Sequence, residues 1–317
     1  VTLYVLIPML VDIPDFAIIA NPVSGRRRSV KIATMAYQKL LRYQPKGKLY
    51  FTQSKGDAYR LAEIAIEEGY SFIVACGGDG TIHEVLNAIC QSEKDSTLGI
   101  LPSGKGNDLA RELNIPSQPT RAVNILLSGQ AKYIDVGEVC SLTTENSQSS
   151  KKYFSTIFTC GFDAEVGRRV TEDKVSSHFW GSLAYVVTAV TTLPIFQPPT
   201  AIIKGDFGIY QGPILICSTG ITTSYGGGMR ILPNAVLDDG QLDVCIIKPV
   251  SNWTVLFMLA KLFWGGHQNH RAVKIFRTTN LSISTDPPMK IYADGEYMGD
   301  TPKHIQILSK RLKVIVP

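Results

Sequence analysis

Over the first 130 residues, short apolar runs alternate with segments of helical spacing. The runs that predict buried strands are FAIIANP (16–22), KLYFT (48–52), SFIVACGGDG (71–80) and LGILPSG (98–104). The segments that predict helices are 29–41, 57–68, 81–90 and, more briefly, 107–113. Because strands and helices alternate regularly, this part of the chain is expected to form βαβ units around a parallel sheet.

The pattern changes after Tyr133, where alternating strand patterns are separated by longer loops rich in Gly, Ser, Thr and Asn. Residues 142–152 are expected to form a polar hairpin tip and residues 178–196 an apolar helix, whereas most of the remainder to Pro317 indicates β-strands. We therefore expect a domain boundary near residue 130. An α/β domain would cover residues 13–130 and a β-rich domain residues 131–304.

Composition and charge narrow the class of protein. The chain has 317 residues, of which 44% are hydrophobic and 19% charged, which suits two ordinary globular domains. A net charge of +5 is too small to indicate nucleic acid as a partner, but it suits an anionic surface or a phosphate-bearing substrate. The six cysteines are widely separated, which is typical of reduced thiols in a cytosolic protein.

The sequence offers no candidate for a membrane-spanning helix. Residues 1–11 are apolar, but they are shorter than the roughly 20 residues that a spanning helix needs. They also lack the basic region and cleavage site of a signal peptide. Contact with a membrane is therefore expected to be peripheral.

The strongest local signal is the loop Gly77-Gly78-Asp79-Gly80-Thr81, between a buried strand and a helix expected to open at Thr81. Glycines let the backbone approach a bulky anion, and the start of a helix offers unpaired N–H groups, so phosphate is expected there. A carboxylate is unexpected in a simple anion site. Asp79 is better explained by Mg²⁺ or a substrate hydroxyl beside the phosphates, with a tight turn capped by Asp79 as the alternative.

Two further loops follow strands of the same predicted sheet. NPVSG (21–25) ends the first strand and is followed by a triple arginine, and LPSGKGND (101–108) ends the fourth. Because ligands bind at the carboxyl edge of open α/β sheets, the three loops are expected to converge. Residues 99–105 nearly match a P-loop, but Gly106 stands where Ser or Thr must hold the metal, so that class of ATPase is excluded.

Taken in order, these segments resemble the diacylglycerol kinase catalytic-domain family of lipid kinases, which includes bacterial diacylglycerol kinases and the sphingosine and ceramide kinases. The matching segments are NPVSG, Thr52 with GDA (56–58), GGDGTIHEVLN, LPSGKGNDLAR, CGFDAEV (160–166), YGGGMRILPNAVLDDGQLDV (225–244) and ADGE (293–296). They cover nearly the whole chain. GGDGT alone also occurs in NAD kinases and phosphofructokinases, whereas seven segments in sequence are far more specific.

The resemblance implies an N-terminal Rossmann-like α/β domain, similar to that of NAD kinases, and a C-terminal β-sandwich domain. The chain end, about residues 305–317, would return to the first domain, and ATP would bind in a cleft between the two domains. The implied cofactors are ATP and Mg²⁺. The residues implied to bind ATP are Asn21, Pro22, Val23, Ser24, Gly25, Thr52, Gly78, Asp79, Gly80, Thr81, Ile82, His83, Glu84 and Lys105.

The resemblance also implies a structural metal and a catalytic base. The metal ligands would be Val236 and Gln241, through carbonyl oxygens, and the carboxylate of Asp239. An Asp-Asp-Gly turn without an ion is the alternative. Asp294 would be the general base, with Asp79 as the second catalytic residue. Lys105 departs from the pattern, because the family usually has a small hydroxyl residue at that position.

The expected activity is transfer of the γ-phosphate of Mg-ATP to the hydroxyl of a membrane lipid, with diacylglycerol, giving phosphatidic acid, as the leading acceptor. The alternatives are a sphingoid-base or ceramide kinase, an NAD kinase, and a non-catalytic nucleotide or lipid sensor. Apolar residues in 179–196 and 253–264 could touch a bilayer, but the packed core of the second domain is the preferred interpretation. The sequence leaves the oligomeric state open, a homodimer included.

Overall fold

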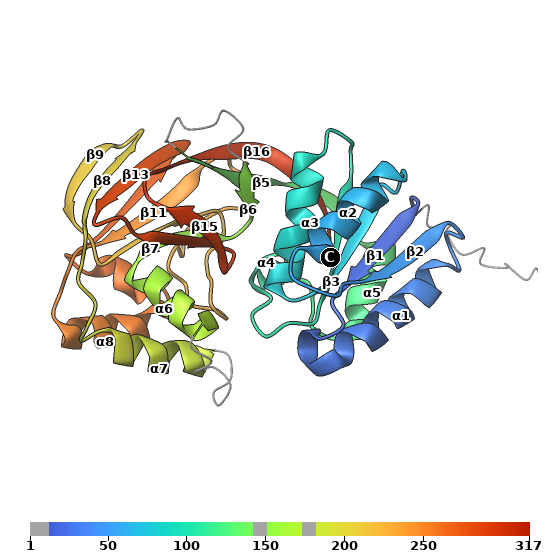
Figure 1. Cartoon of the computed structure of the whole chain (residues 1–317), viewed down its shortest axis with the longest axis horizontal. Helices are drawn as coiled ribbons and strands as arrows, with labels where there is room; N and C mark the ends of the chain where they lie inside the picture. Colours follow the sequence, from blue (N-terminus) through green and yellow to red (C-terminus); the bar gives the residue numbers. More distant parts are fainter. Residues whose placement is uncertain (1–12, 142–150, 173–181) are drawn as a thin grey trace, which may run out of the picture. The chain divides into compact units, whose positions relative to one another are not determined.

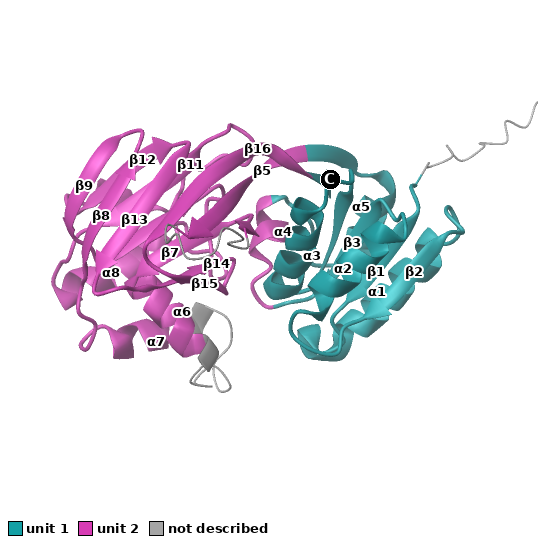
Figure 2. Cartoon of the chain, turned by 45° about the horizontal axis from the view of Figure 1, so that its top comes forward, with its two compact units in different colours: residues 1–104, 113–132, 313–317 teal, residues 105–112, 133–312 magenta. Residues whose placement is uncertain are grey.

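The computed structural model describes residues 13–141, 151–172 and 182–317. The apolar residues 1–11, nearly all of the predicted hairpin tip and the start of the predicted 178–196 helix lie outside the described residues. Contacts divide the chain into two units (Figure 2). Unit 1 comprises residues 1–104, 113–132 and 313–317, and unit 2 comprises residues 105–112 and 133–312.

Unit 1 is built on a parallel sheet. Its strands lie in the order β2 (Gly47–Phe51), β1 (Phe16–Ala20), β3 (Phe72–Gly77) and β4 (Thr97–Pro102), and the end of β16 (Lys303–Val316) runs parallel to β4. Every residue of β1 and β3 is buried, which explains their continuous apolar runs. The predicted parallel sheet and the return of the chain end to the first domain are confirmed.

The helices of unit 1 are α1 (Arg28–Leu40), α2 (Asp57–Glu67), α3 (Asp79–Gln91) and α5 (Pro119–Ser128), with a 3₁₀ turn η1 at Ser24–Arg27. Helix α1 packs beside α5, and α2 beside α3 (Figure 1). Helix α5 was missed from the sequence, although Pro119 stands in its first turn, where proline is favoured. Helix α3 begins at Asp79, two residues before the predicted start, because Gly78 is the extended N-cap residue.

Unit 2 contains two antiparallel sheets. The first is formed by β16, β13 (Asn280–Asp286), β8 (Thr200–Gly205) and β9 (Gly208–Pro213), with β5 (Gln130–Ser141) pairing with β16 and β6 (Lys152–Phe154) with β5. The second has the order β12 (Val273–Thr278), β11 (Leu242–Ile247), β10 (Ile216–Gly220), β7 (Ile157–Gly161), β14 (Lys290–Ala293) and β15 (Glu296–Asp300). The predicted β-sandwich is confirmed.

Unit 2 also holds more helix than the sequence predicted. Its helices are α4 (Asp108–Glu112), α6 (Phe162–Glu172), α7 (Ser182–Thr192) and α8 (Asn252–Leu262), followed by the 3₁₀ turn η3 (Gly266–Asn269). Helix α8 begins where Ser251 Oγ accepts a hydrogen bond from Thr254 N at 3.3 Å. Its Val255, Met258 and Leu262 are buried in a core cluster shared with residues of α7.

The cysteines and the lengths of the helices can also be compared with what the sequence predicted. All six cysteines are free, and five are buried, in agreement with reduced structural thiols. Within the described parts of the chain, every helix is too short or too polar to cross a bilayer.

Candidate active site

The three predicted loops meet at one edge of the sheet in unit 1. Strands β1, β3 and β4 are parallel neighbours, so their carboxyl ends lie together. Ser24 Oγ lies 3.0 Å from Ser103 Oγ, and Ser103 N donates to the Gly77 carbonyl at 2.8 Å. Asn21 Nδ2 donates to Thr81 Oγ1 at 3.4 Å. The structure therefore brings together the loops at residues 21–25, 77–81 and 103–104.

Glycines are needed where these loops touch. Gly25 has a φ of +58°, and a Cβ atom there would lie 2.3 Å from the Ser103 carbonyl oxygen. A Cβ atom on Gly78 would lie 3.2 Å from the Cα atom of Gly104. These glycines serve loop-to-loop packing, a constraint that comes in addition to the predicted approach of the backbone to phosphate.

The amino terminus of α3 lies within this cluster of loops. Gly78 is the N-cap residue and Asp79 is in the first turn, while Thr81 and Ile82 are buried. The first N–H groups of a helix have no acceptor inside the helix, and the helix dipole favours an anion beside them. Phosphate binding at this edge is therefore chemically available from backbone groups alone.

Glu84, predicted to bind ATP, contacts the start of α2. Its two carboxylate oxygens accept hydrogen bonds from Gly56 N and Ala58 N, both at 2.9 Å. These are orphan donors at a helix start, so Glu84 acts as a cap supplied by a neighbouring helix. Its direct role is to fix the segment that follows β2, which includes the buried Thr52.

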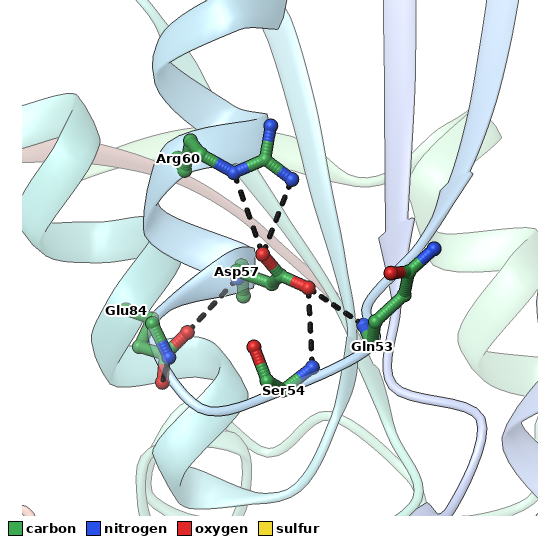
Figure 3. A network of polar contacts seen from close by, with 7 residues as sticks. Gln53, Ser54, Asp57, Arg60 and Glu84 are labelled. Carbon is green, nitrogen blue, oxygen red and sulfur yellow. Dashed lines mark hydrogen bonds and ion pairs between the residues drawn. The ribbon is translucent and has the colours of Figure 1, made fainter.

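A second carboxylate holds the same segment (Figure 3). Asp57 Oδ2 accepts hydrogen bonds from Gln53 N at 2.8 Å and Ser54 N at 3.1 Å, and Asp57 Oδ1 is paired with Arg60. The backbone hydrogen bond from Gln53, followed by that from the Arg60 side chain, lowers the pKa of Asp57. His83, also predicted to bind ATP, has its Nε2 atom 3.3 Å from Asn87 Nδ2.

Asp294, the predicted base, lies in the turn of the β14–β15 hairpin in unit 2. Asp294 and Gly295 have φ values of +53° and +80°, which is the pattern of a two-residue type I′ turn. Asp294 Oδ1 accepts from Thr156 N at 2.8 Å and from Thr156 Oγ1 at 2.5 Å, and Oδ2 accepts from Ser155 N at 3.1 Å. The carboxylate is therefore held in a fixed orientation.

Ser155 and Thr156, which hold the predicted base, were missed by the sequence reasoning. Both are buried, and they lie immediately before β7, whose neighbour in the sheet is β14. The stretch FSTIF carries no signal beyond that of an ordinary strand start. Only the pairing of β7 with β14, more than 130 residues apart in the chain, brings these donors to Asp294.

The predicted metal turn, residues 236–241, is held by hydrogen bonds to Asp135. Asp135 is buried, and its carboxylate accepts from Gly240 N at 2.6 Å and from Lys310 N at 2.7 Å. Asp239 Oδ1 accepts from Gln241 N at 3.1 Å, while its Oδ2 is ion-paired with Arg277. Val236 is exposed.

The environment of the nearby Asp243 carboxylate indicates whether this turn suits a metal ion. Its Oδ2 atom is buried without a hydrogen-bond partner and lies 3.6 Å from Arg277 Nε. Burial raises the pKa of Asp243, Arg277 lowers it, and the charge of Asp239 raises it. Carboxylate and carbonyl oxygens are the ligands of a hard divalent cation, so the turn fits Mg²⁺ chemically. In the structure, however, the Arg277 guanidinium already supplies positive charge there.

Among the described residues, no three His, Cys, Asp or Glu side chains form a group that could hold a metal ion. A cation at the 236–241 turn would therefore depend on the main-chain carbonyls of Val236 and Gln241, as predicted, together with Asp239.

Helix α4 connects two of the segments that carried the family resemblance. Lys105 follows Gly104 directly and is exposed, and it belongs to unit 2. Asp108 Oδ1 accepts from Gly227 N at 3.1 Å, and Glu112 Oε2 accepts from Thr223 N at 3.2 Å and Thr223 Oγ1 at 2.8 Å. The segment LPSGKGND thus reaches the glycine loop of YGGGMR, a contact that the sequence did not reveal.

A buried acid of unit 2 was also missed. Asp163, in the CGFDAEV segment, accepts from Ala164 N at 2.9 Å and from Ser218 Oγ at 2.8 Å, and the Tyr225 hydroxyl lies 3.4 Å away. Burial raises the pKa of Asp163 to about 7, although these hydrogen bonds act in the opposite direction.

Comparison with known proteins gives matches to both units. Residues 15–139 match the family model described as the diacylglycerol kinase catalytic domain, and residues 156–316 match the YegS C-terminal NAD kinase beta sandwich-like domain. A diacylglycerol kinase from Staphylococcus epidermidis is 29% identical over 300 residues, covering 95% of this chain and 91% of the relative. The diacylglycerol kinase from Staphylococcus carnosus is also 29% identical, with 95% and 94% covered.

Solved structures show the same fold. A diacylglycerol kinase from Bacillus anthracis superposes with a TM-score of 0.73 at 20% identity, covering 96% of this chain and 97% of the other. A yeast NADH kinase complexed with NADH gives a TM-score of 0.52 at 10% identity, covering 96% and 84%. At these identities the superpositions support the architecture alone.

Proposed function

The chain belongs to the diacylglycerol kinase family, and from this premise we propose that it transfers the γ-phosphate of ATP to the hydroxyl group of a membrane lipid, with diacylglycerol as the first candidate. The product of that reaction would be phosphatidic acid. As a member of this family, the protein is an ATP-dependent lipid kinase.

One observation carries the proposal: three strand-end loops of unit 1 converge on the amino terminus of α3. Phosphoryl transfer requires positioning and charge stabilisation more than covalent chemistry, and backbone N–H groups at a helix start supply both for phosphate oxygens. The proposed ATP ligands are residues 21–25, Thr52, residues 78–84 and Lys105. Glu84 would in addition act by positioning, together with Asp57, because their carboxylates hold the segment that follows Thr52.

Asp79 stands in the first turn of α3 and is proposed to act beside the phosphates. A Mg²⁺ ion bound there would neutralise the charge that develops on the transferred group. A second, structural Mg²⁺ is proposed at the 236–241 turn, held by Val236, Asp239 and Gln241, where it would compete with Arg277 for Asp239.

Asp294 is proposed as the general base. The lipid hydroxyl would donate its proton to the carboxylate as its oxygen attacks the γ-phosphorus, and the bond from that phosphorus to the β-phosphate oxygen would break to release ADP. Thr156 and Ser155 would keep the carboxylate in one orientation, because they donate to both of its oxygens. The lipid acceptor implies peripheral contact with an anionic membrane surface.

An NAD kinase is the second candidate, because GGDGT is common to both families and the yeast NADH kinase shares the fold. In the deciding experiment, the purified protein is incubated with Mg-ATP labelled on the γ-phosphate and with one acceptor at a time: diacylglycerol, sphingosine, ceramide or NAD. We expect label on diacylglycerol. Label on sphingosine or ceramide alone would make that lipid the acceptor in place of diacylglycerol. Label on NAD alone would establish the second candidate, and no label on any acceptor would indicate a non-catalytic sensor.

A further inference from the structure

Helix α8 of unit 2 has two apolar faces, of which only one is covered. Val255, Met258 and Leu262 point into the core cluster and are buried. On the opposite side, Trp253 is 83% exposed and Phe257 60% exposed, and Trp264, just past the helix end, is 67% exposed. Because residues four apart share a helix face, Trp253 and Phe257 lie side by side. We call Trp253, Phe257 and Trp264 the aromatic face. It corrects the interpretation of residues 253–264 as packed core alone.

The charges in the segment that carries the aromatic face are all of one sign. Residues 248–271 contain no Asp or Glu, and their charged side chains are Lys248, Lys261 and Arg271. Lys261 lies on the same side of α8, with its Nζ atom 4.4 Å from the centroid of the Phe257 ring. The region thus combines exposed aromatic rings with positive charge.

Helix α7, which shares a core cluster with α8, adds exposed apolar side chains without charge. Ala189 and Leu193 pack in the same core cluster as α8. Residues 182–203 contain no charged side chain, and Val190 and Ile195 are 44% and 60% exposed.

Exposed tryptophans flanked by lysine and arginine, without acids, match the chemistry of the interface of an anionic bilayer. Tryptophan and phenylalanine insert at the level of the head groups, and basic side chains attract anionic lipids. A surface that binds another protein would instead be expected to carry acidic and hydrogen-bonding side chains around its apolar residues. We infer that the aromatic face docks unit 2 onto a lipid bilayer carrying anionic head groups. The inference rests on the proposed function, because the acceptor lipid resides in such a bilayer.

The test compares the parent with a variant carrying Trp253→Ala, Phe257→Ala and Trp264→Ala. These side chains are exposed, so the variant is expected to fold, which circular dichroism and thermal unfolding would check. Ile209→Ala is the matched control, since Ile209 is an exposed apolar residue, 67% exposed, on β9. Binding is measured by flotation with vesicles of phosphatidylcholine mixed with phosphatidylglycerol, and with phosphatidylcholine alone.

We expect the triple variant to bind the mixed vesicles at least tenfold more weakly than the parent and the Ile209→Ala control. Binding of the parent should also weaken with added salt and on pure phosphatidylcholine. Kinase activity toward long-chain diacylglycerol in vesicles should fall with binding, whereas activity toward a water-soluble short-chain diacylglycerol should stay unchanged.

Unchanged vesicle binding by the triple variant would overturn the inference. So would a dimeric parent and a monomeric variant in light scattering, since the aromatic face would then be covered by a second copy of the chain. If the triple variant loses binding while no form of the protein phosphorylates either diacylglycerol, the docking surface stands and the proposed function fails.

Discussion

The two units bury different kinds of polar group. Among the described residues, the buried polar side chains of unit 1 are all hydroxyls: Ser29, Thr52, Thr81, Ser96 and Ser103. Unit 2 buries four carboxyl groups and a histidine: Asp135, Glu138, Asp163, Asp243 and His267. Unit 1 therefore offers neutral donors that do not titrate, whereas unit 2 holds groups whose charge depends on pH or on a bound cation.

This difference matches a division of chemical roles. Binding a phosphate group requires N–H and O–H donors, which a helix start and glycine loops supply at any pH. Carboxylates fixed by hydrogen bonds suit a proton acceptor or a metal ligand, and unit 2 fixes Asp294 and Asp239 in this way, although Asp79 of unit 1 is also proposed beside Mg²⁺. The first comparison to test is thus between an acid of unit 2 that is proposed to react and one that is only buried.

The largest effect is expected from Asp294→Asn. Loss of the base should lower kcat by about 10²- to 10⁴-fold, while the KM for ATP stays unchanged, because the ATP ligands proposed in unit 1 are intact. The asparagine keeps an oxygen that can accept from Thr156 N, so the hairpin should hold. Steady-state kinetics and thermal unfolding measure both quantities.

Thr156→Val is the companion variant, since it removes only the hydroxyl that donates to Asp294 Oδ1. Thr156→Val should lower kcat less than Asp294→Asn does. In the double variant, it should cause little further loss of kcat beyond that of Asp294→Asn alone. A kcat for Asp294→Asn close to that of the parent, in a folded protein, would remove Asp294 from the base role.

The second prediction concerns Asp163, a buried acid to which no catalytic role is assigned. Its pKa is about 7 in the folded protein, above the ordinary value of 3.8, so the folded state binds more protons than the unfolded state between these values. Stability from this group is therefore greatest at low pH and is lost as the pH rises from about 4 to about 7. The loss should be of the order of 2–4 kcal/mol.

Asp163→Asn removes the titrating group while keeping an amide that can bond Ser218 and Ala164. Urea unfolding at pH 5 and pH 8 should show that the free energy of unfolding falls less with pH in the variant than in the parent. Equal slopes of the free energy of unfolding against pH would mean that Asp163 titrates at its ordinary pKa. Asp163 would then no longer distinguish unit 2 from unit 1.

The same difference between the units explains what could be read from the sequence. In unit 1 the strands β1, β3 and β4 are almost wholly buried, so continuous apolar runs predicted them within two or three residues. Convergence of their loops followed from the rule that parallel neighbours share a carboxyl edge. Local pattern and topology were sufficient there.

In unit 2 the decisive contacts join segments that are far apart in the chain. Thr156 reaches Asp294 across 138 positions, and Asp108 reaches Gly227 across 119. A strand pattern does not specify its partner strand in an antiparallel sandwich, so such pairs cannot be derived from local periodicity. Helix α8 was missed because its exposed aromatic residues break the expected alternation of apolar and polar faces.

The third prediction tests the backbone packing of unit 1. Gly25→Ala places a Cβ atom 2.3 Å from the Ser103 carbonyl oxygen at a left-handed φ, so the loop must move. Stability should fall by about 1–3 kcal/mol, and the KM for ATP should rise roughly tenfold because the phosphate loops separate. Thermal unfolding and ATP kinetics provide the readouts.

Gly69→Ala is the control for strain alone. Gly69 also has a left-handed φ, +94°, but a Cβ atom at this position would have no neighbouring atom within 4 Å, and Gly69 follows the end of α2. It should lose about 1 kcal/mol with no change in the KM for ATP. If both variants behaved alike, contact between the loops would not be what holds the ATP site.

The smallest effect is expected at the acidic turn of unit 2, where Arg277 and the proposed Mg²⁺ would compete for Asp239. The Arg277 side chain is 45% exposed, so its pair with Asp239 is screened by solvent and should contribute only about 1 kcal/mol. Arg277→Gln should therefore lower stability modestly in the absence of divalent cations. Mg²⁺ at ten times its Kd would then restore about 1.4 kcal/mol, because Asp239 would be released to bind it.

The informative quantity is the rise in Tm on adding Mg²⁺, measured in the parent, in Arg277→Gln and in Lys274→Gln, a charge-matched control on the same strand β12. A larger rise in Arg277→Gln than in the other two proteins would show that the arginine occupies the place of the metal. Adding Asp239→Asn should abolish that rise, since the turn then lacks its only predicted carboxylate ligand. An equally large rise in the parent would mean that Mg²⁺ readily displaces Arg277 from Asp239.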